Sequence, residues 1–351
     1  MHQNGTVTRS NTYKMPGWAR KAGIRAGVVC AWILMVAMLM EPETSARAAR
    51  RAMEQWYHAV APALFPFMML MPLITCREAA YVYEKLFGKL MQTLLGLPGC
   101  TAPAVIIGMM AGSPAGAAAA ARIAENEGIG RGELFRIVIC SCGLSPAFLI
   151  SGIGMGWLND ANSGVLLLKC QVITQAIMLV CTRYMAKGDR IIHSNVFDEA
   201  TGMGTAVSSV LNVAGYMVFF GVIADVVTAK LGNTGSMISC VLEVSTGASI
   251  ISGINMDKTG KLIILSWICE FGGISICAQN LKILTKFGIL PCRYIVWKGI
   301  QASASAIVMA AAVHLESVHG HYAMLNLPAI AVLGAVLLVI PAVLGVKRPI
   351  S

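Results

Sequence analysis

The sequence predicts an all-α polytopic membrane protein, with about eight crossing helices, two re-entrant hairpins and an inverted repeat. Three observations lead to this fold class: the composition, a series of apolar runs, and a repeated order of motifs. The chain has 351 residues, of which 56% are hydrophobic and 13% are charged, whereas soluble domains are about 25% charged. A soluble fold could not hide so much apolar surface, and a disordered chain needs low hydrophobicity. The composition therefore indicates a membrane-embedded protein.

The net charge of +10 comes from 27 Lys and Arg residues against 17 acids. These basic residues lie mostly beside apolar runs, where the cytoplasmic loops of membrane proteins collect them. They form no basic-aromatic cluster, so nucleic acid is not an expected partner. The 11 cysteines fall mostly inside apolar runs, and the Cys140–Cys142 pair lacks a second Cys/His pair nearby. We expect no metal site, no cofactor and no disulfide framework.

The N-terminal tail, residues 1–25, is basic and contains no acid, which predicts that it lies in the cytoplasm. Residues 26–55 are expected to form the first transmembrane helix and a loop. The apolar run at 26–40 has 15 residues, fewer than the roughly 20 that cross a bilayer as a helix. A cleaved signal peptide is therefore the alternative to a retained helix.

Nine further apolar runs follow, each close to the length that crosses a bilayer. They lie near 60–76, 97–121, 137–158, 163–182, 206–229, 236–256, 262–284, 299–315 and 323–346. Two charged, amphipathic segments, at 77–93 and 286–298, are expected to lie along the membrane interface.

Similar motifs recur in the same order in the two halves of the chain. A Leu-Phe-Pro-Phe stretch, a Gly-Ser-Pro stretch and a Gly-Leu-Ser stretch in the first half have counterparts of similar character in the second. Such internal repeats with interrupted helices are typical of secondary transporters. We expect a first repeat at 56–186, a polar linker at 187–205, a second repeat at 206–298, and C-terminal transmembrane helices at 299–351.

The orientation of the repeats depends on the run at 97–121. If this run crosses fully, the two halves are parallel, and if it is a re-entrant hairpin, they are inverted. The Gly112-Ser113-Pro114 sequence in the middle of the run makes a turn easy. We therefore expect hairpins at 97–121 and 236–256, with both termini in the cytoplasm.

Two acids, Glu243 and Glu270, interrupt apolar runs. A charged side chain at the bilayer centre costs about 2.5–3.5 kcal/mol on insertion scales. Either they face an aqueous cavity, where they bind a proton, sodium or a polar solute, or each is the partner of a buried Lys or Arg. The adjacent amides Gln279 and Asn280 are costly unless satisfied, and would serve a polar solute or a helix–helix bond.

Four small-residue motifs at 112–114, 143–146, 246–249 and 272–275 combine flexible backbone with hydroxyl groups. Broken helices are tolerated at membrane depth where they line a cavity, and their N-termini favour anions. Close helix packing by small residues is the alternative. The expected substrate site contains Gly112, Ser113, Pro114, Gly143, Ser145, Glu243, Thr246, Ser249, Glu270, Gly272, Gly273, Ser275, Gln279 and Asn280.

Several of these stretches carry a resemblance to a known family. Residues 56–67 (WYHAVAPALFPF), the Gly112–Gly116 stretch, and residues 271–279 (FGGISICAQ) resemble the sporulation integral membrane proteins of the YlbJ type. The resemblance covers roughly residues 50–300 and implies two Gate-like repeats, since that family carries the nucleoside-recognition Gate domain and is related to concentrative nucleoside transporters. One departure is that five alanines precede Arg122, where the family commonly has a basic residue.

The resemblance implies a transporter of endospore-forming bacteria, associated with delivery of dipicolinate, a small aromatic dicarboxylate, into the spore. We expect a transporter or facilitator for a small, polar, anionic metabolite in the bacterial cell membrane or outer forespore membrane. The alternatives are a nucleoside transporter and a non-transporting assembly factor for the spore envelope. An enzyme is not expected, since the loose GxSx match at Ser249 has only His314, at the end of an apolar run, as a plausible base. The expected partners are the solute and the lipid bilayer, with a homo-oligomer as an alternative to a monomer.

Overall fold

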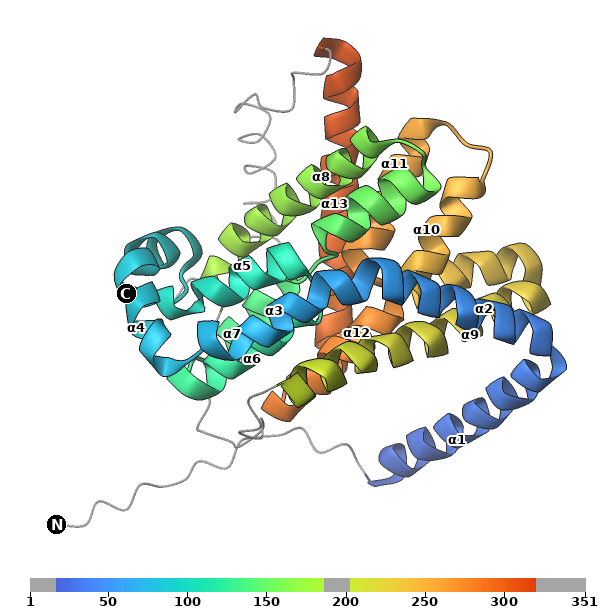
Figure 1. The fold of residues 1–351 in the computed structure, drawn as a ribbon, viewed down its shortest axis with the longest axis horizontal. Helices are drawn as coiled ribbons and strands as arrows, with labels where there is room; N and C mark the ends of the chain where they lie inside the picture. The colour runs from blue at the N-terminus through green and yellow to red at the C-terminus, as the bar shows by residue number, and fades with distance from the viewer. Residues whose placement is uncertain (1–16, 186–202, 320–351) are drawn as a thin grey trace. The chain divides into compact units, whose positions relative to one another are not determined.

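The computed structural model describes residues 17–185 and 203–319, and all regular structure in these two ranges is helical (Figure 1). The chain divides into two units, Met1–Pro42 and Glu43–Ser351. The expected polar linker, apart from its last three residues, and the apolar run at 323–346 lie outside the described residues. In the first unit, α1 is one helix, Gly17–Met40, so the expected boundary between tail and first helix falls inside it.

The second unit begins with a polar helix that continues into an apolar one. Helix α2 (Pro42–Gln55), the π-helical segment η1 (Trp56–Val60) and α3 (Ala61–Ile74) follow one another without a break. The loop expected at the end of 26–55 is therefore wrong, because the Ala- and Arg-rich sequence of α2 has high helix propensity. Pro62 cannot donate a backbone hydrogen bond to the preceding turn, and the chain widens into the π-helix there.

The next segment is bent. Helix α4 (Arg77–Leu90) with η2 (Met91–Leu95) meets η3 (Gly99–Thr101) with α5 (Ala102–Ala111) at an angle of 95°. The buried guanidinium of Arg136 donates to the Leu95 and Leu179 carbonyl oxygens near this bend. These bonds satisfy carbonyl groups that helix ends leave without partners.

Helix α6 (Ala115–Glu127) packs closely against α5, as the expected break at Gly112–Pro114 requires. A Cβ atom built on Gly116 would lie 2.4 Å from the Cα atom of Gly108. Four of the five alanines at 117–121 are fully buried, so a long basic side chain has no room at these four positions. The first half then continues with α7 (Arg131–Ser141), η4 (Phe148–Trp157), α8 (Ala161–Cys181) and η5 (Thr182–Tyr184).

The second half contains a comparable close pair. Helix α9 (Met203–Leu242) is interrupted at Gly232, where φ is 55° and ψ is −127°. Its last ten residues pack against α10 (Val244–Gly253), and a Cβ atom built on Gly247 would lie 2.8 Å from the Cα atom of Cys240. Helices α11 (Lys258–Phe271) and α12 (Gly273–Leu284) follow, then η6 (Thr285–Phe287) and α13 (Pro291–His319).

Helix α13 packs against α11, α8, α7 and α12 (Figure 1). The segment 286–298, expected to lie along the interface, is corrected here: residues 291–298 are the first turns of α13, and Lys298 is buried. Five helices of the described part are long and apolar enough to cross a membrane, or six if the bent pair counts as one span.

Candidate functional site

Two helix breaks of the first half lie against each other. The chain between α5 and α6 turns at Gly112, with φ of 74°, and Ser113–Pro114, a cis peptide bond. The Ser113 backbone N–H donates to the Gly143 carbonyl oxygen at 2.9 Å, in the break between α7 and η4. A Cβ atom on Gly112 would lie 2.8 Å from that same oxygen. Glycine at position 112 therefore permits both the turn and the close approach.

The two breaks of the second half also lie against each other. Helix α10 begins after Glu243, and α12 begins after Gly272 in the left-handed conformation. A Cβ atom on Gly273, whose φ is 73°, would lie 3.0 Å from the Leu242 carbonyl oxygen and 3.3 Å from the Glu243 Cα atom. Each half thus brings the tip of a close helix pair against a break in the following helix.

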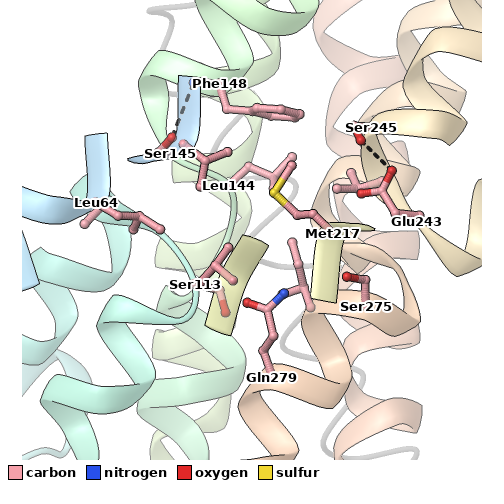
Figure 2. A pocket seen from close by; sticks show the side chains of 15 residues that line it. Leu64, Ser113, Leu144, Ser145, Phe148, Met217, Glu243, Ser245, Ser275 and Gln279 are labelled. Atoms are coloured by element: carbon pink, nitrogen blue, oxygen red, sulfur yellow. Dashed lines mark hydrogen bonds between the residues drawn. The ribbon is translucent and has the colours of Figure 1, made fainter. Parts of the chain in front are cut away.

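All four breaks meet around one small cavity. Figure 2 shows Ser113 and Ser145 from the first half on one side, and Glu243 and Ser275 from the second half on the other. Gln279 also lines the cavity, together with Ser245. The rest of the lining is apolar and comes from η1, α3, α9 and the residues beside the breaks: Val60, Leu64, Ala111, Leu144, Phe148, Val213, Met217, Val244 and Ile276.

The cavity volume is about 50 Å³, which is room for one or a few water molecules. Pockets that bury a small-molecule ligand typically measure about 300–1,000 Å³. The cavity is therefore too small for a larger solute, which could bind there only if the surrounding helix ends separate.

Four helical segments begin at this cavity, which determines its electrostatics. They are α6, the segment that contains η4, α10 and α12. Helix N-termini expose backbone N–H groups and carry the positive end of the helix dipole. Two of these ends are already capped by side chains: the Ser145 hydroxyl accepts from the Phe148 N–H at 3.3 Å, and the Glu243 carboxylate accepts from the Thr246 N–H at 2.8 Å.

Glu243 combines a capping role with a place in the cavity wall. Glu243 is only 2% exposed. The same carboxylate oxygen that caps α10 also accepts from the Ser245 hydroxyl, as Figure 2 shows. No Lys or Arg among the described residues forms an ion pair with it. The acid is thus held by neutral donors.

Polar contacts also cross between the two halves. The Ser113 hydroxyl donates to Asn280 Oδ1 at 2.6 Å, and Asn280 Nδ2 donates to the Tyr294 hydroxyl at 2.7 Å. Asn280 therefore makes an interhelical bond and does not line the cavity. Gln279 does line it, and its side-chain oxygen has no hydrogen-bond partner in the described part of the chain.

Glu270 lies elsewhere. It is 1% exposed and sits at the end of α11, where Lys298 Nζ of α13 lies 3.7 Å from its Oε1 atom. Of the two interpretations of this acid, the structure favours a carboxylate with a buried basic partner. Glu270 is not among the residues that line the cavity.

The expected break at 246–249 is displaced. Thr246 and Ser249 lie within α10, and the chain breaks three residues earlier, at Glu243. The small residues there serve helix packing, as the Gly247–Cys240 approach shows. Thr246 Oγ1 accepts from Arg51 Nη2 at 3.3 Å, and Arg51 also pairs with Asp225 at 2.7 Å. Neither Thr246 nor Ser249 lines the cavity.

Sequence reasoning missed four buried polar side chains that support the breaks. The Gln171 amide donates to the Leu144 carbonyl oxygen at 2.8 Å and accepts from the Leu144 N–H at 3.2 Å. Gln175, Lys298 and Gln301 surround Glu270. Gln171 and Gln175 share one face of α8, as Lys298 and Gln301 share one face of α13. Polar residues spaced three or four apart inside an apolar run were the signal that could have identified them.

Comparison with known proteins agrees with the membrane assignment. The chain is 22% identical over 303 residues to the sporulation integral membrane protein YlbJ of Bacillus subtilis (strain 168), a match that covers 73% of this chain and 74% of that protein. No family model and no solved structure matches. The chain is a multi-pass integral membrane protein, distantly homologous to a sporulation integral membrane protein.

Proposed function

We propose that this protein transports a small, polar, anionic solute across a bacterial membrane through the cavity at the four helix breaks. One observation carries the proposal: breaks from both halves of the chain converge on a single cavity and line it with hydroxyl and amide groups. Non-helical backbone at membrane depth is tolerated where it lines such a cavity. Secondary transporters bind their substrates at broken helices between internal repeats.

The chemistry of the cavity supports an anion with an apolar body. Four helix N-termini favour negative charge, and Ser113, Ser145 and Ser275 offer hydroxyl donors. Leu64, Phe148 and Met217 line the same space, so a ring could pack against them. An aromatic dicarboxylate such as dipicolinate meets both requirements. The resemblance to sporulation membrane proteins, and the name of the relative, support a role during spore formation in the cell membrane or outer forespore membrane.

Glu243 is the group that we assign to coupling. Its negative charge opposes an anion in the cavity unless a proton or a sodium ion compensates for it. No basic side chain of the described residues pairs with it, so its charge is open to such compensation. Entry of the anion would then be favoured together with a cation.

The proposed architecture follows the same reasoning. The close pairs α5–α6 and the end of α9 with α10 would be re-entrant hairpins related by an inverted repeat, with about eight crossings in the whole chain. Movement of one hairpin tip away from the opposite break would open the cavity to one side of the membrane.

The test is solute exchange in proteoliposomes that contain the purified full-length protein. Labelled dipicolinate, simple dicarboxylates and nucleosides are offered with and without proton and sodium gradients. We expect uptake of a dicarboxylate that a gradient stimulates and that Glu243→Gln makes insensitive to that gradient. Uptake of nucleosides alone would replace the anion with the nucleoside alternative, and no uptake of any solute would favour a membrane assembly factor.

A further inference from the structure

Four polar side chains are buried together between α8, α11 and α13. Glu270 and Lys298 are each 1% exposed, and Gln175 and Gln301 are fully buried. Gln301 Nε2 donates to Glu270 Oε1 at 2.5 Å, and Lys298 Nζ lies 3.7 Å from the same oxygen. Gln175 lies beside Glu270 and also touches Gly143, where a Cβ atom would be 2.4 Å from its Nε2 atom.

The hydrogen-bonding capacity of this cluster is largely unused. Glu270 Oε2, Lys298 Nζ, Gln301 Oε1 and both amide atoms of Gln175 have no hydrogen-bond partner among the described residues. Buried polar groups are normally satisfied, and each exception requires an explanation. At 3.7 Å the ammonium is held by charge and not by a hydrogen bond. The cluster therefore contains the groups of an ion site, a carboxylate and two amides, next to one positive charge, and its amide oxygens accept from no donor among the described residues.

We propose that Glu270, Gln175 and Gln301 form a monovalent-cation site whose cation is the side-chain ammonium of Lys298. An ammonium carries the same single charge as an alkali ion, and carboxylate and carbonyl oxygens suit hard cations. Because this ammonium is covalently part of the chain, it neutralises the Glu270 carboxylate without any ion from solution.

A consequence is that sodium does not bind at Glu270. A second cation beside Lys298 would leave a net positive charge in an enclosed site, and an uncompensated buried charge is expensive. Where the chain acts as the transporter proposed above, its coupling cation therefore binds at Glu243 and not at Glu270. The single variant Glu270→Gln cannot test coupling, because it leaves the Lys298 ammonium buried without its partner.

The experiment uses thermal unfolding of the purified full-length protein in detergent, with NaCl or choline chloride at equal ionic strength. The wild-type protein should unfold at the same temperature in both salts. Lys298→Ala should unfold at a lower temperature in choline chloride and regain at least about 3 °C, saturably, as sodium replaces choline. The matched control is the double variant Glu270→Gln/Lys298→Met, which removes both charges and should show no response to sodium.

Three results would overturn the proposal. The first is a sodium-specific rise in the unfolding temperature of the wild-type protein. The second is a Lys298→Ala variant that does not respond to sodium, including one that only a lower pH stabilises, since a proton would then replace the ammonium. The third concerns the case in which Lys298→Ala gives no folded protein in choline chloride. If this variant also fails to fold in NaCl, while the double variant does fold, an ion site is contradicted. Recovery of folded Lys298→Ala in NaCl would support it. None of these readouts requires solute uptake, so an absence of transport would overturn the proposed function alone.

Discussion

The two halves of the molecule build the same backbone arrangement with different chemistry. In the first half, Gly112 and Gly143 bring two breaks together, and neutral groups hold them. In the second half, Gly273 lies against Glu243, and charged side chains cap or support the breaks. The difference shows that broken helices can converge without any charged side chain. The charged groups are additional, and they are where we place the response to ions.

The supports of the breaks differ in the same way. Gln171 of α8 satisfies both backbone groups of Leu144 with one amide, so this break is fixed without any charge. Glu243 instead satisfies the N–H of Thr246 with a carboxylate oxygen, so a charged side chain caps the start of α10. We therefore expect the first half to respond to packing changes, and the second half to respond also to ions.

The largest effect is expected at the close helix pair of the first half. Gly116→Ala places a Cβ atom 2.4 Å from the Gly108 Cα atom, whereas Gly247→Ala places one 2.8 Å from Cys240 in the second half. Because both contacts are with backbone, neither can relax cheaply, and overpacking costs about 1–3 kcal/mol or more. Gly116→Ala should be the more destabilising of the two in denaturant unfolding. The control is Gly253→Ala, which meets no atom within 4 Å, and equal stability of all three variants would contradict this comparison.

A second prediction concerns the neutral support of the first half. Gln171→Leu keeps roughly the side-chain volume but leaves the N–H and C=O of Leu144 without their partner. Leaving a buried group unsatisfied lowers the free energy of unfolding by about 1–3 kcal/mol. Thr174→Val is the matched control, because the Thr174 hydroxyl bonds only within its own helix, to Cys170 at 2.8 Å. Unfolding midpoints of the two variants compare them directly. A Gln171→Leu variant as stable as Thr174→Val would mean that Leu144 finds other partners.

A third prediction separates the cap from the charge at Glu243. Glu243→Ala removes the acceptor for the Thr246 N–H and should cost about 1 kcal/mol, as the loss of an N-cap does. Glu243→Gln keeps an acceptor oxygen and should unfold within about 0.5 kcal/mol of the wild-type protein. In proteoliposomes, however, Glu243→Gln should lose the dependence of uptake on the ion gradient. Gradient-dependent uptake by this variant would remove Glu243 from coupling.

The smallest effect is expected where the two halves meet outside the membrane segments. Asp160 caps α8, and hydrogen bonds from Lys258 at 2.7 Å and from Ser163 lower its pKa to about 2. The lowered pKa means that its contribution to stability is fully present above the unfolded value near 4 and is lost as the pH falls through about 2. Asp160→Asn should therefore unfold at a slightly lower temperature than wild type, by a constant margin from pH 7 to 5. A margin that shrinks within that range would contradict the lowered pKa.

Three of the four breaks could be predicted from sequence because they depend on local chemistry. Glycine or proline at positions 112–114, 143–146 and 272–273 marks each one, and these residues favour turns and helix ends. The fourth break was placed at 246–249 because small residues also mark turns. There they allow α10 to approach α9, and the break falls at Glu243, whose carboxylate caps the new helix. A stretch of small residues can therefore mark either a turn or a close contact between helices, and its composition does not distinguish the two.

Partners distant in sequence could not be predicted. Lys298 is the last residue of the charged segment 286–298, which was expected to lie along the membrane interface. In the structure it belongs to α13 and lies beside the buried Glu270. The pairing of Ser113 with Asn280, 167 residues apart, also depends on how the halves meet. Such contacts require the tertiary structure, whereas the acids and hydroxyls themselves were visible in the sequence.

The most direct test of a cavity shared by both halves is dicarboxylate uptake by two single variants in proteoliposomes. Ser113→Ala changes the first half and Ser275→Ala the second, while Ser252→Ala, whose hydroxyl bonds to Ala248 within α10 and does not line the cavity, is the control. We predict that both cavity variants lower the rate of uptake at least about threefold and that the control does not. Uptake reduced by only one cavity variant, or by neither, would contradict a binding site formed by the two halves together.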